Sequence, residues 1–279
     1  MEEFSVTIKA LTPIWTGDAD KKCSTLRETG IIGSLRWWYE ALVRGLGGCA
    51  CDPTEENLRC KLEHDKFYKA LKSGKTISEA LNEQICPTCQ LFGCTGWSRK
   101  FKLEVGETTD EVTLKFIELK KIEKVEWDLL NRTLTIISDF GAIGGKLSEA
   151  NYGVIQIKEN NLNRKHKYIS KKEELDHYLN LKEQGRSADN PNLSRFIFIN
   201  TNTDENLING MVKEIKRELS FLKGSKNKGK KYFYKKITKN NGRFFAYAEN
   251  SDEYSKIVEF LSKKSIQYME GVKILEGLK

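Results

Sequence analysis

The chain contains seven cysteines, and two of them have the spacing of a metal-binding pair. Cys86 and Cys89 enclose Pro-Thr in a C-x-x-C motif, which lets two thiolates reach one zinc ion. Cys51 and Cys60 are the preferred partners for a tetrahedral shell, and Cys94 is an alternative ligand. A structural zinc would hold together a long insertion that has little apolar core. Free buried thiols are the alternative to a metal site.

Redox catalysis is a less favoured role for the same pair. A helix that follows the first cysteine lowers the thiolate pKa in redox motifs, and we expect no helix after Cys86. An odd number of cysteines in a large charged chain is also typical of reduced thiols or a metal site, because disulfide scaffolds are small and rich in cysteine. We therefore expect no disulfides.

A second group of residues lies where an amphipathic helix is expected, from about residue 32 to 45. The first N–H groups of a helix have no partner within it and can bind a phosphate. Because Gly30 and Gly33 have no side chains, a phosphate site behind them would be unobstructed. Arg27 and Arg36 could complete that site.

Trp37 lies on the polar side of this helix. A turn of about 100° per residue places Trp37 and Arg44 nearly opposite the apolar stripe. An exposed aromatic beside arginines could stack on a nucleobase or dock to another protein, because both use its flat apolar face. Another part of the same chain could also cover it. The sequence leaves these three alternatives open.

Glycines recur in Phe140–Lys146 (FGAIGGK). The segment follows a predicted helix and precedes a predicted strand, so it has neither the context of a dinucleotide site nor the spacing of a Walker motif. No nucleotide cofactor is therefore expected. Glycines here would let a polynucleotide backbone approach closely, with Lys146 as the cation. An ordinary tight turn explains them equally well.

The charge of the chain favours a polyanionic partner. It has 47 Lys and Arg against 39 Asp and Glu, a formal net charge of +8, which concentrates polyanions near the surface. A basic run at 223–236 adds to the excess, although such runs are more often solvated faces or disordered arms. No apolar segment approaches the roughly 20 residues that span a bilayer, and no signal peptide is recognisable. We expect a cytoplasmic protein.

The histidines are the candidates for acid–base catalysis. A metal-independent endoribonuclease would use a histidine as general acid or base. His64, His166 and His177 each lie in a polar, lysine-rich stretch without a recognisable partner. Surface positions are the simpler interpretation, so we do not expect an enzyme.

Hydrophobic periodicity predicts an α+β fold of two tandem ferredoxin-like (RRM-like) βαββαβ domains. In the first half we expect a strand at 4–11, helices at 32–45 and 64–83, strands at 99–105 and 112–119, a helix at 124–139 and a strand at 152–158. In the second half we expect a helix at 171–184, a strand at 195–201, a helix at 205–222, strands at 231–237 and 243–248, and a helix at 252–264. The expected domains are 1–160, with a cysteine-containing insertion at about 49–98, and a degenerate second domain at 161–279.

Four segments together resemble the first subunits of Cmr complexes, which are RAMP-superfamily proteins of type III-B CRISPR effectors. They are Leu11–Ala19 (LTPIWTGDA), Arg27–Gly48 (RETGIIGSLRWWYEALVRGLGG), Cys86–Leu103 (CPTCQLFGCTGWSRKFKL) and the FGAIGGK turn. The resemblance covers about residues 1–158. It implies a non-catalytic RNA-binding subunit in antiviral defence, which caps the particle near the 3′ end of the guide RNA. Guide RNA, target RNA and other RAMP subunits are the implied partners.

The resemblance also assigns candidate residues. The family's basic helix-start motif falls on Arg27, Arg36 and Arg44, and its glycine-rich loop departs from the usual basic pattern after Lys146, where Glu149 intervenes. A guide-processing endoribonuclease and a purely architectural cap are the alternative functions. The complete set of candidate RNA-binding residues is Arg27, Gly30, Gly33, Ser34, Arg36, Trp37, Arg44, Trp97, Arg99, Lys100, Gly141, Gly144, Gly145 and Lys146.

Overall fold

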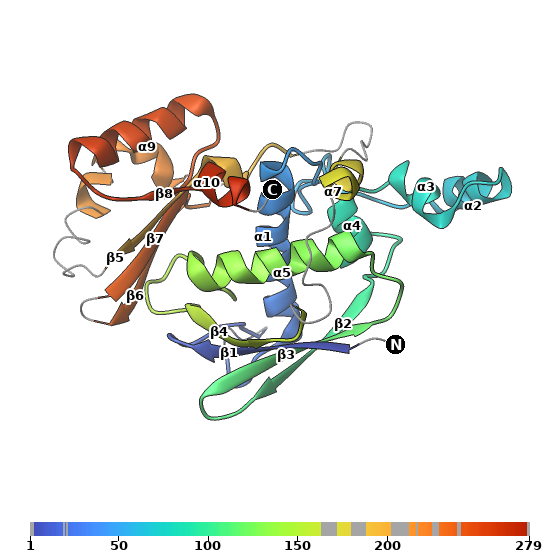
Figure 1. The fold of residues 1–279 in the computed structure, drawn as a ribbon, viewed down its shortest axis with the longest axis horizontal. Coiled ribbons are helices and arrows are strands. Elements are labelled where there is room, and N and C mark those ends of the chain that lie inside the picture. Colours follow the sequence, from blue (N-terminus) through green and yellow to red (C-terminus); the bar gives the residue numbers. More distant parts are fainter. Residues whose placement is uncertain are drawn as a thin grey trace.

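The computed structural model of the chain describes residues 3–18, 20, 22–162, 172–179, 188–201, 212–215, 217–224, 229–238 and 241–277. Two four-stranded antiparallel sheets organise them, with the orders β2-β3-β1-β4 and β6-β7-β5-β8 (Figure 1). Each sheet has the same order when its strands are numbered from its own first strand, and this order is that of a ferredoxin-like unit. The predicted α+β class with two tandem ferredoxin-like units is confirmed.

Two helices cover one face of the first sheet, whereas its other face is open (Figure 1). Alternation in β1 turns Phe4, Val6 and Ile8 toward these helices and Ser5 and Thr7 away from them. The elements of this unit are β1 (Glu3–Ala10), α1 (Glu28–Gly45), β2 (Phe101–Glu107), β3 (Glu111–Glu118), α5 (Lys124–Asp139) and β4 (Ile155–Asn160). All of them match predicted elements, although α1 begins one turn earlier than expected.

The cysteine-containing insertion leaves this unit between α1 and β2 and extends sideways as an arm (Figure 1). Its helices are α2 (His64–Lys72), α3 (Ile77–Asn82) and α4 (Pro87–Phe92). The single helix predicted at 64–83 is wrong, because Gly74 takes a φ of +93° and Thr76 then starts α3 with a capping box to Glu79. The insertion has its own small apolar cluster, which contains four cysteines.

The second unit contains the other sheet and its flanking helices. Its elements are β5 (Phe196–Thr201), β6 (Tyr232–Thr238), β7 (Asn241–Tyr247), α9 (Ser251–Lys263), β8 (Met269–Glu270) and α10 (Gly271–Glu276), with 3-10 turns at Leu193–Arg195 and Ser220–Lys223. Of the helix predicted at 205–222, residues 212–215 and 217–218 are helical, and 202–211 lie outside the described residues. His166 also lies outside them.

The boundary predicted at residue 160 stays a prediction. The first sheet ends at Asn160 and the second begins at Phe196, but α7 (Lys172–Leu179) between them packs on the first unit. The hydroxyl groups of Tyr39 and Tyr178 lie 3.1 Å apart in that contact. Among the described residues, no helix combines the length and the apolar character needed to cross a membrane.

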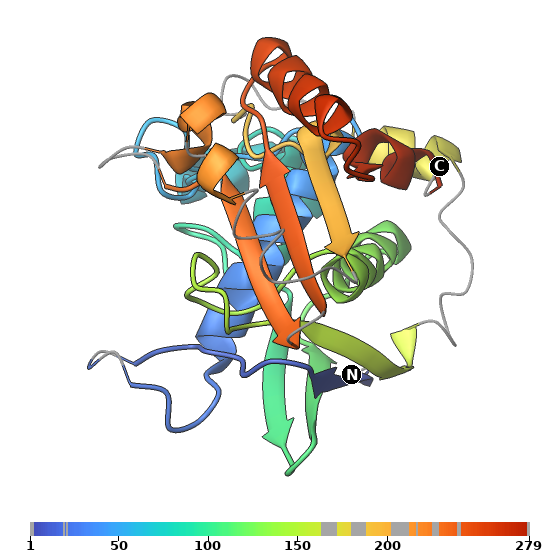
Figure 2. The same ribbon diagram turned by 90° about the vertical axis from the view of Figure 1, so that its left-hand side faces the viewer.

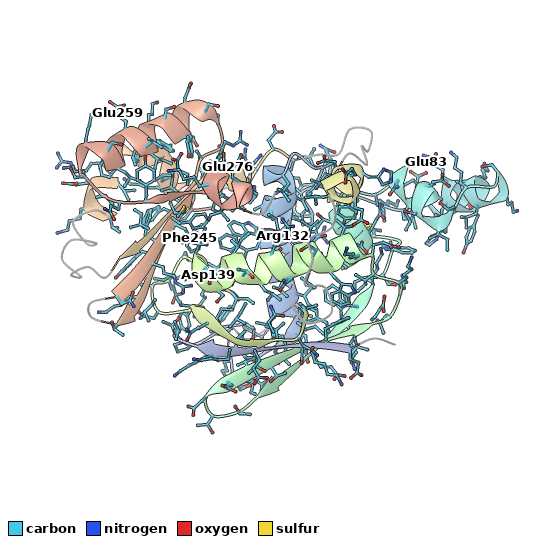
Figure 3. All side chains as sticks on the ribbon, in the orientation of Figure 1. Glu83, Arg132, Asp139, Phe245, Glu259 and Glu276 are labelled. Carbon is cyan, nitrogen blue, oxygen red and sulfur yellow. The ribbon has the colours of Figure 1, made fainter. Side chains whose placement is uncertain are left out.

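Helix α1 lies between the two sheets (Figure 2). The Trp38 ring lies 5.3 Å from that of Phe245, and the Trp37 ring lies 6.1 Å from Phe233 and 6.2 Å from Tyr247. Phe245 lies where the second sheet meets the helices of the first unit (Figure 3). Of the three alternatives for Trp37, the structure shows cover by another part of the same chain, which leaves the ring partly exposed.

Polar contacts join the glycine-rich turn to the second sheet. The buried Lys235 donates from Nζ to the Glu149 carbonyl oxygen at 2.8 Å, and the Lys236 N–H donates to the Ala150 carbonyl at 2.8 Å. Arg243 donates to the Gly141 carbonyl oxygen at 3.2 Å. The turn is thus held from both units.

Replacing Trp37 with alanine is expected to destabilise the chain itself, because it removes a large ring from the contact between the units. Removal of a fully buried aromatic ring costs about 3 kcal/mol or more, so loss of the partly buried Trp37 ring should cost about 2 kcal/mol, which urea unfolding of the isolated chain would detect. Leu119→Ala, at a side chain that is 55% exposed, is the control and should change stability by less than about 0.5 kcal/mol. Unchanged stability in Trp37→Ala would contradict the observed packing.

Lys235 should give the stability of the protein a recognisable pH dependence. Burial lowers the pKa of Lys235 from 10.5 to about 8, against the smaller opposing effect of Glu149. The unfolded state therefore binds more protons between these pH values, so this lysine makes the unfolding free energy rise as pH increases through that window. In Lys235→Met this contribution is absent. The unfolding free energy of the wild type minus that of Lys235→Met should increase by about 2 kcal/mol between pH 7 and pH 10. For Lys102→Met, at an exposed lysine, the same difference should not change with pH.

Candidate nucleic-acid interface and metal centre

The structure brings the glycine-rich turn and the start of α1 to one surface. Trp15 and Thr16 lie between them, since the Gly145 N–H donates to the Trp15 carbonyl oxygen at 2.6 Å and the Arg27 N–H donates to the Thr16 hydroxyl at 2.8 Å. The two motifs, which are far apart in the sequence, are therefore neighbours. We name the surface formed by Trp15, Arg27, Gly145, Lys146 and Tyr152 the turn surface.

Trp15 explains why the turn contains glycines. A Cβ on Gly144 would lie 2.7 Å from the Trp15 carbonyl oxygen, and one on Gly145 would lie 2.8 Å from the indole ring. Gly144 also has a φ of +94°, which side-chain-bearing residues rarely adopt. Gly141 has a different role, because its Cβ would meet the Trp38 ring at 2.5 Å. The glycines thus serve close packing of tryptophans.

Lys146 is the cation of the turn surface. Its Nζ lies 4.6 Å from the centroid of the Trp15 ring and 5.6 Å from that of Tyr152, and both rings are partly exposed. Its ion pair with Glu149 is loose, at 3.9 Å. A cation flanked by two accessible aromatic rings offers phosphate neutralisation and base stacking together. Sequence reasoning missed Trp15 and Tyr152; their positions next to glycine-containing turns were the available signal.

Arg27 is the second cation on the turn surface. Its side chain is 52% exposed and approaches Asp18 only at 3.9 Å. Because α1 begins at Glu28, Gly30 lies in its first turn, where its N–H bonds back to the Arg27 carbonyl, and Gly33 lies in the second turn. The predicted phosphate site behind both glycines is therefore wrong. Gly30 instead leaves room for Thr16, whose Cβ would lie 2.8 Å from a Cβ at that position.

Arg36 and Arg44 are committed to contacts inside the protein. Arg36 donates to Glu40 at 2.8 Å, to the Gly93 carbonyl at 2.8 Å and to the Cys89 sulfur at 3.1 Å. The Arg44 side chain is 3% exposed, and it donates to three backbone carbonyl oxygens, those of Ala50, Cys51 and Pro191. Their predicted role in phosphate binding is therefore corrected to a structural one.

Other predicted RNA-binding side chains are also engaged within the fold. Trp97 donates from its indole to the Gln90 carbonyl, and Arg99 donates to the Phe101 carbonyl. Lys100 is buried and bonds both oxygens of Glu126, at 2.8 and 2.7 Å. Ser34 is buried, and its hydroxyl has no hydrogen-bond partner among the described residues. The Trp97 and Lys100 donors are therefore taken up within the protein, and the Ser34 hydroxyl is buried away from a phosphate.

Gly33 and Trp37 line a cleft of about 530 Å³ between the two units. Carboxylates of Asp52, Glu55 and Glu249 also line it, whereas its two arginines, Arg36 and Arg44, are engaged as described above. Negative charge at the cleft disfavours a phosphate backbone. The outward side of α1 is therefore not an electropositive site.

The two sheets differ from RNA-binding RRM sheets. In an RRM, aromatic side chains on the open sheet face stack with bases. Here the aromatic face of the second sheet, including Phe196 and Phe245, is buried against α1. The open face of the first sheet carries polar residues such as Ser5 and Thr7. Neither sheet face provides an accessible aromatic platform.

The preferred metal ligands do lie together. The sulfur atoms of Cys51, Cys60, Cys86 and Cys89 are all within 4.8 Å of one another, and all four residues are buried. We name them the cysteine cluster. The alternative ligand Cys94 lies outside this set and is partly exposed, with its thiol near the Thr95 carbonyl. The structure therefore provides a four-sulfur candidate metal site at the root of the arm.

One correction concerns the C-x-x-C motif. A helix does follow it, because α4 begins at Pro87 with Cys86 as its N-cap. The helix does not activate Cys86, however, since its hydrogen bond with Cys51 raises the pKa of the Cys86 thiol well above its usual value.

Arg36 lies against the cysteine cluster. Burial lowers the pKa of Arg36, but the charges of Cys89 and Glu40 outweigh burial, so the pKa is raised. A permanently cationic group therefore lies against the sulfur atoms.

The described histidines lie on the surface. His64 and His177 are both exposed, and His64 lies beside the ring of Tyr68 at 6.4 Å between centroids. Within the described part of the chain, neither has a hydrogen bond to a carboxylate or hydroxyl group that would orient it for proton transfer.

Comparison with known proteins identifies the family. The family model described as the RAMP superfamily matches residues 7–148. Cmr1 from Pyrococcus furiosus, in its apo form, is 12% identical with a TM-score of 0.52, and the match covers 97% of this chain and 99% of that one. A chain of the type III-B Cmr-beta complex bound to cognate target RNA is 13% identical with a TM-score of 0.51, covering 95% and 100%. Curated protein sequences gave no significant match. Because the family model spans half of its length, the chain belongs to the RAMP superfamily.

Proposed function

We propose that the chain is a non-catalytic RNA-binding subunit of a type III-B CRISPR effector particle. The observation that carries this proposal is the fold match to Cmr1 over nearly the whole of both chains, in a chain that belongs to the RAMP superfamily. The similar Cmr-beta chain comes from a complex with target RNA. The proposed partners are guide RNA, target RNA and other RAMP subunits, with a position near the 3′ end of the guide.

The turn surface is the proposed RNA contact. Arg27 and Lys146 are its cations, and each has only a loose ion pair at 3.9 Å that a phosphate can replace. Trp15 and Tyr152 supply apolar ring faces next to Lys146. Contacts to backbone and ring faces do not read sequence, which suits a subunit in which base pairing between guide and target does so.

The proposal of a non-catalytic role is supported by the surface positions of His64 and His177. An endoribonuclease of this kind needs an oriented acid–base group next to the RNA. Neither histidine belongs to the turn surface. Cleavage of a repeat RNA that is lost on replacing one histidine would favour the alternative function.

Lys146→Asn is the variant that tests the RNA contact. Lys146 has a φ of 51°, and asparagine tolerates this left-handed conformation while removing the cation. Loss of one phosphate contact should weaken binding of a single-stranded RNA several-fold at low salt. It should also reduce the slope of log affinity against log salt by about one. Filter binding over a salt series measures both quantities.

Lys263→Asn is the matched control, because Lys263 is 69% exposed and lies on α9, outside the turn surface. It should leave affinity and slope nearly unchanged. An equal loss in both variants would assign RNA binding to net charge alone. Absence of RNA affinity in the wild-type chain, alone and within the assembled particle, would overturn the proposal.

We also propose that the cysteine cluster binds a structural zinc ion. Tetrahedral coordination with Zn–S bonds of about 2.3 Å separates the sulfur atoms by about 3.8 Å, and the observed sulfurs lie within 4.8 Å of one another. The short distance of 3.4 Å between the Cys51 and Cys89 sulfurs also fits a common ligand. Zinc would pin the base of the arm to α1, since Arg36 bonds to the same sulfurs.

Zinc release should be measurable on the purified chain. One zinc ion per chain is expected by elemental analysis, and Cys86→Ser should lose it, because three remaining thiolates bind the ion weakly. The thermal midpoint should fall by roughly 5–10 °C, as loss of a few kcal/mol shifts it by about 2–4 °C per kcal/mol. Cys23→Ser, at a cysteine outside the cluster, should keep zinc and stability. If the purified wild-type protein contains no zinc and Cys86→Ser has the same thermal midpoint as the wild type, free buried thiols would be favoured instead.

A further inference from the structure

A second cleft, of about 460 Å³, lies between the arm and the start of α5. Ile77 and Leu81 of α3, together with Trp97 and Tyr178, supply apolar surface, and Lys120 and Lys121 also line the cleft. Ile77 is 59% exposed, which is unusual for an isoleucine. The helix α3 belongs to the arm that extends sideways from the two sheets (Figure 1).

Lys120 is the distinctive polar group of this cleft. Its Nζ lies 3.7 Å from the centroid of the Trp97 ring and donates to the Ser98 carbonyl and hydroxyl oxygens at 3.0 and 2.6 Å. Among the described residues, no carboxylate forms an ion pair with it. The nearby acids have other partners, since Glu126 holds Lys100 at 2.7 Å and Glu123 pairs with Lys121 at 3.1 Å.

The surroundings of Lys120 are unfavourable for an uncompensated charge. Burial lowers its pKa, and the positive charge of Lys100 lowers it further. An incoming carboxylate would relieve both effects, because an opposite charge favours the ionised amine. The apolar walls next to it favour an aliphatic or aromatic side chain over a small hydrated anion.

We propose that this cleft binds an acidic–apolar peptide segment of a neighbouring protein, with a carboxylate on Lys120 and an apolar side chain against Ile77, Leu81 and Trp97. The charge of Lys120 selects an acidic residue in the peptide. The exposed Ile77 supplies apolar area for the apolar residue next to it in the peptide. RNA is the less suitable occupant, because the other two lysines of the cleft, Lys100 and Lys121, are paired with Glu126 and Glu123 and leave a single cation for a phosphate backbone. The site is separate from the turn surface and does not depend on RNA binding.

The test uses the isolated full chain and three peptides of matched size in isothermal titration calorimetry. The probes are Ac-Glu-Leu-Phe-Glu-NH2, its Gln-Leu-Phe-Gln counterpart and its Lys-Leu-Phe-Lys counterpart. The acidic peptide should bind about fivefold more tightly than the glutamine peptide, as one ion pair at a partly exposed site contributes up to about 1 kcal/mol. The difference should shrink at high salt.

Two variants separate the charge from the apolar contact. Lys120→Met should abolish the preference for the acidic peptide while the glutamine peptide binds as before. Ile77→Ser, which removes apolar area without adding a charge and lies at an exposed side chain, should weaken every peptide. Lys69→Met, on α2 and outside the cleft, is the matched lysine control and should behave like the wild type.

Three results would overturn the proposal. One is the absence of peptide binding, and another is a Lys120→Met variant that keeps the acidic preference. The third is displacement of the acidic peptide by an oligouridylate in Lys146→Asn, which would assign the cleft to RNA. The oligouridylate is added to a variant that is weakened at the turn surface, so displacement of the peptide would report on the cleft. Failure of the proposed RNA contact would be seen separately, in the filter-binding experiment.

Discussion

The packing of α1 between two sheets determines most of what the protein presents to its surroundings. Leu35 and Leu42 face the first unit, whereas Trp37 and Trp38 pack on the aromatic face of the second. Past its exposed beginning, a helix covered on two sides has little solvated surface. Its charged residues Glu40 and Arg44 are buried and Arg36 is mostly buried, and burial of charge is tolerated only with full pairing. Arg36, Glu40 and Arg44 meet this requirement through each other and through backbone carbonyl groups.

This packing also moves nucleic-acid binding away from the sheets. The second sheet has the aromatic residues of an RRM-like surface, but Phe196, Phe233 and Phe245 are used to hold the two units together. The edge of the two packed units stays accessible, and there loops connect the strands and helices of a rigid scaffold. Loops in such positions commonly carry binding residues. The turn surface fits this pattern, because Arg243 of the second unit bonds to its glycine-rich turn and Lys235 bonds to Glu149 directly after that turn.

Periodicity in the sequence was sufficient for the longer strands and helices of both units, because each of them buries a regular face. It missed β8 and α10 at the end of the second unit, which are only two and six residues long. It was insufficient for Trp37, Arg36 and Arg44, whose partners come from distant segments: the second sheet, the Gly93 turn and the segment around Pro191. The helical wheel treated α1 as a surface helix, and that assumption failed. The cysteine cluster was predictable as a set because the C-x-x-C motif lies in the same insertion as Cys51 and Cys60, whereas Trp15 needed the fold to bring it to Lys146.

The same helix links the cysteine cluster to the contact between the units. Arg36 donates to the Cys89 sulfur and to Glu40, and Arg44 lies 3.7 Å from Glu40 and donates to the Pro191 carbonyl in the second unit. Burial raises the pKa of Glu40 to about 7 against the opposing effects of the two arginines, so its ionised form depends on both of them. With zinc bound as proposed, four thiolates around the divalent cation would have a net charge of about −2, which would hold Arg36 in this position. The sulfur atoms thus stabilise a row of charges that runs along α1 from the arm to the second unit.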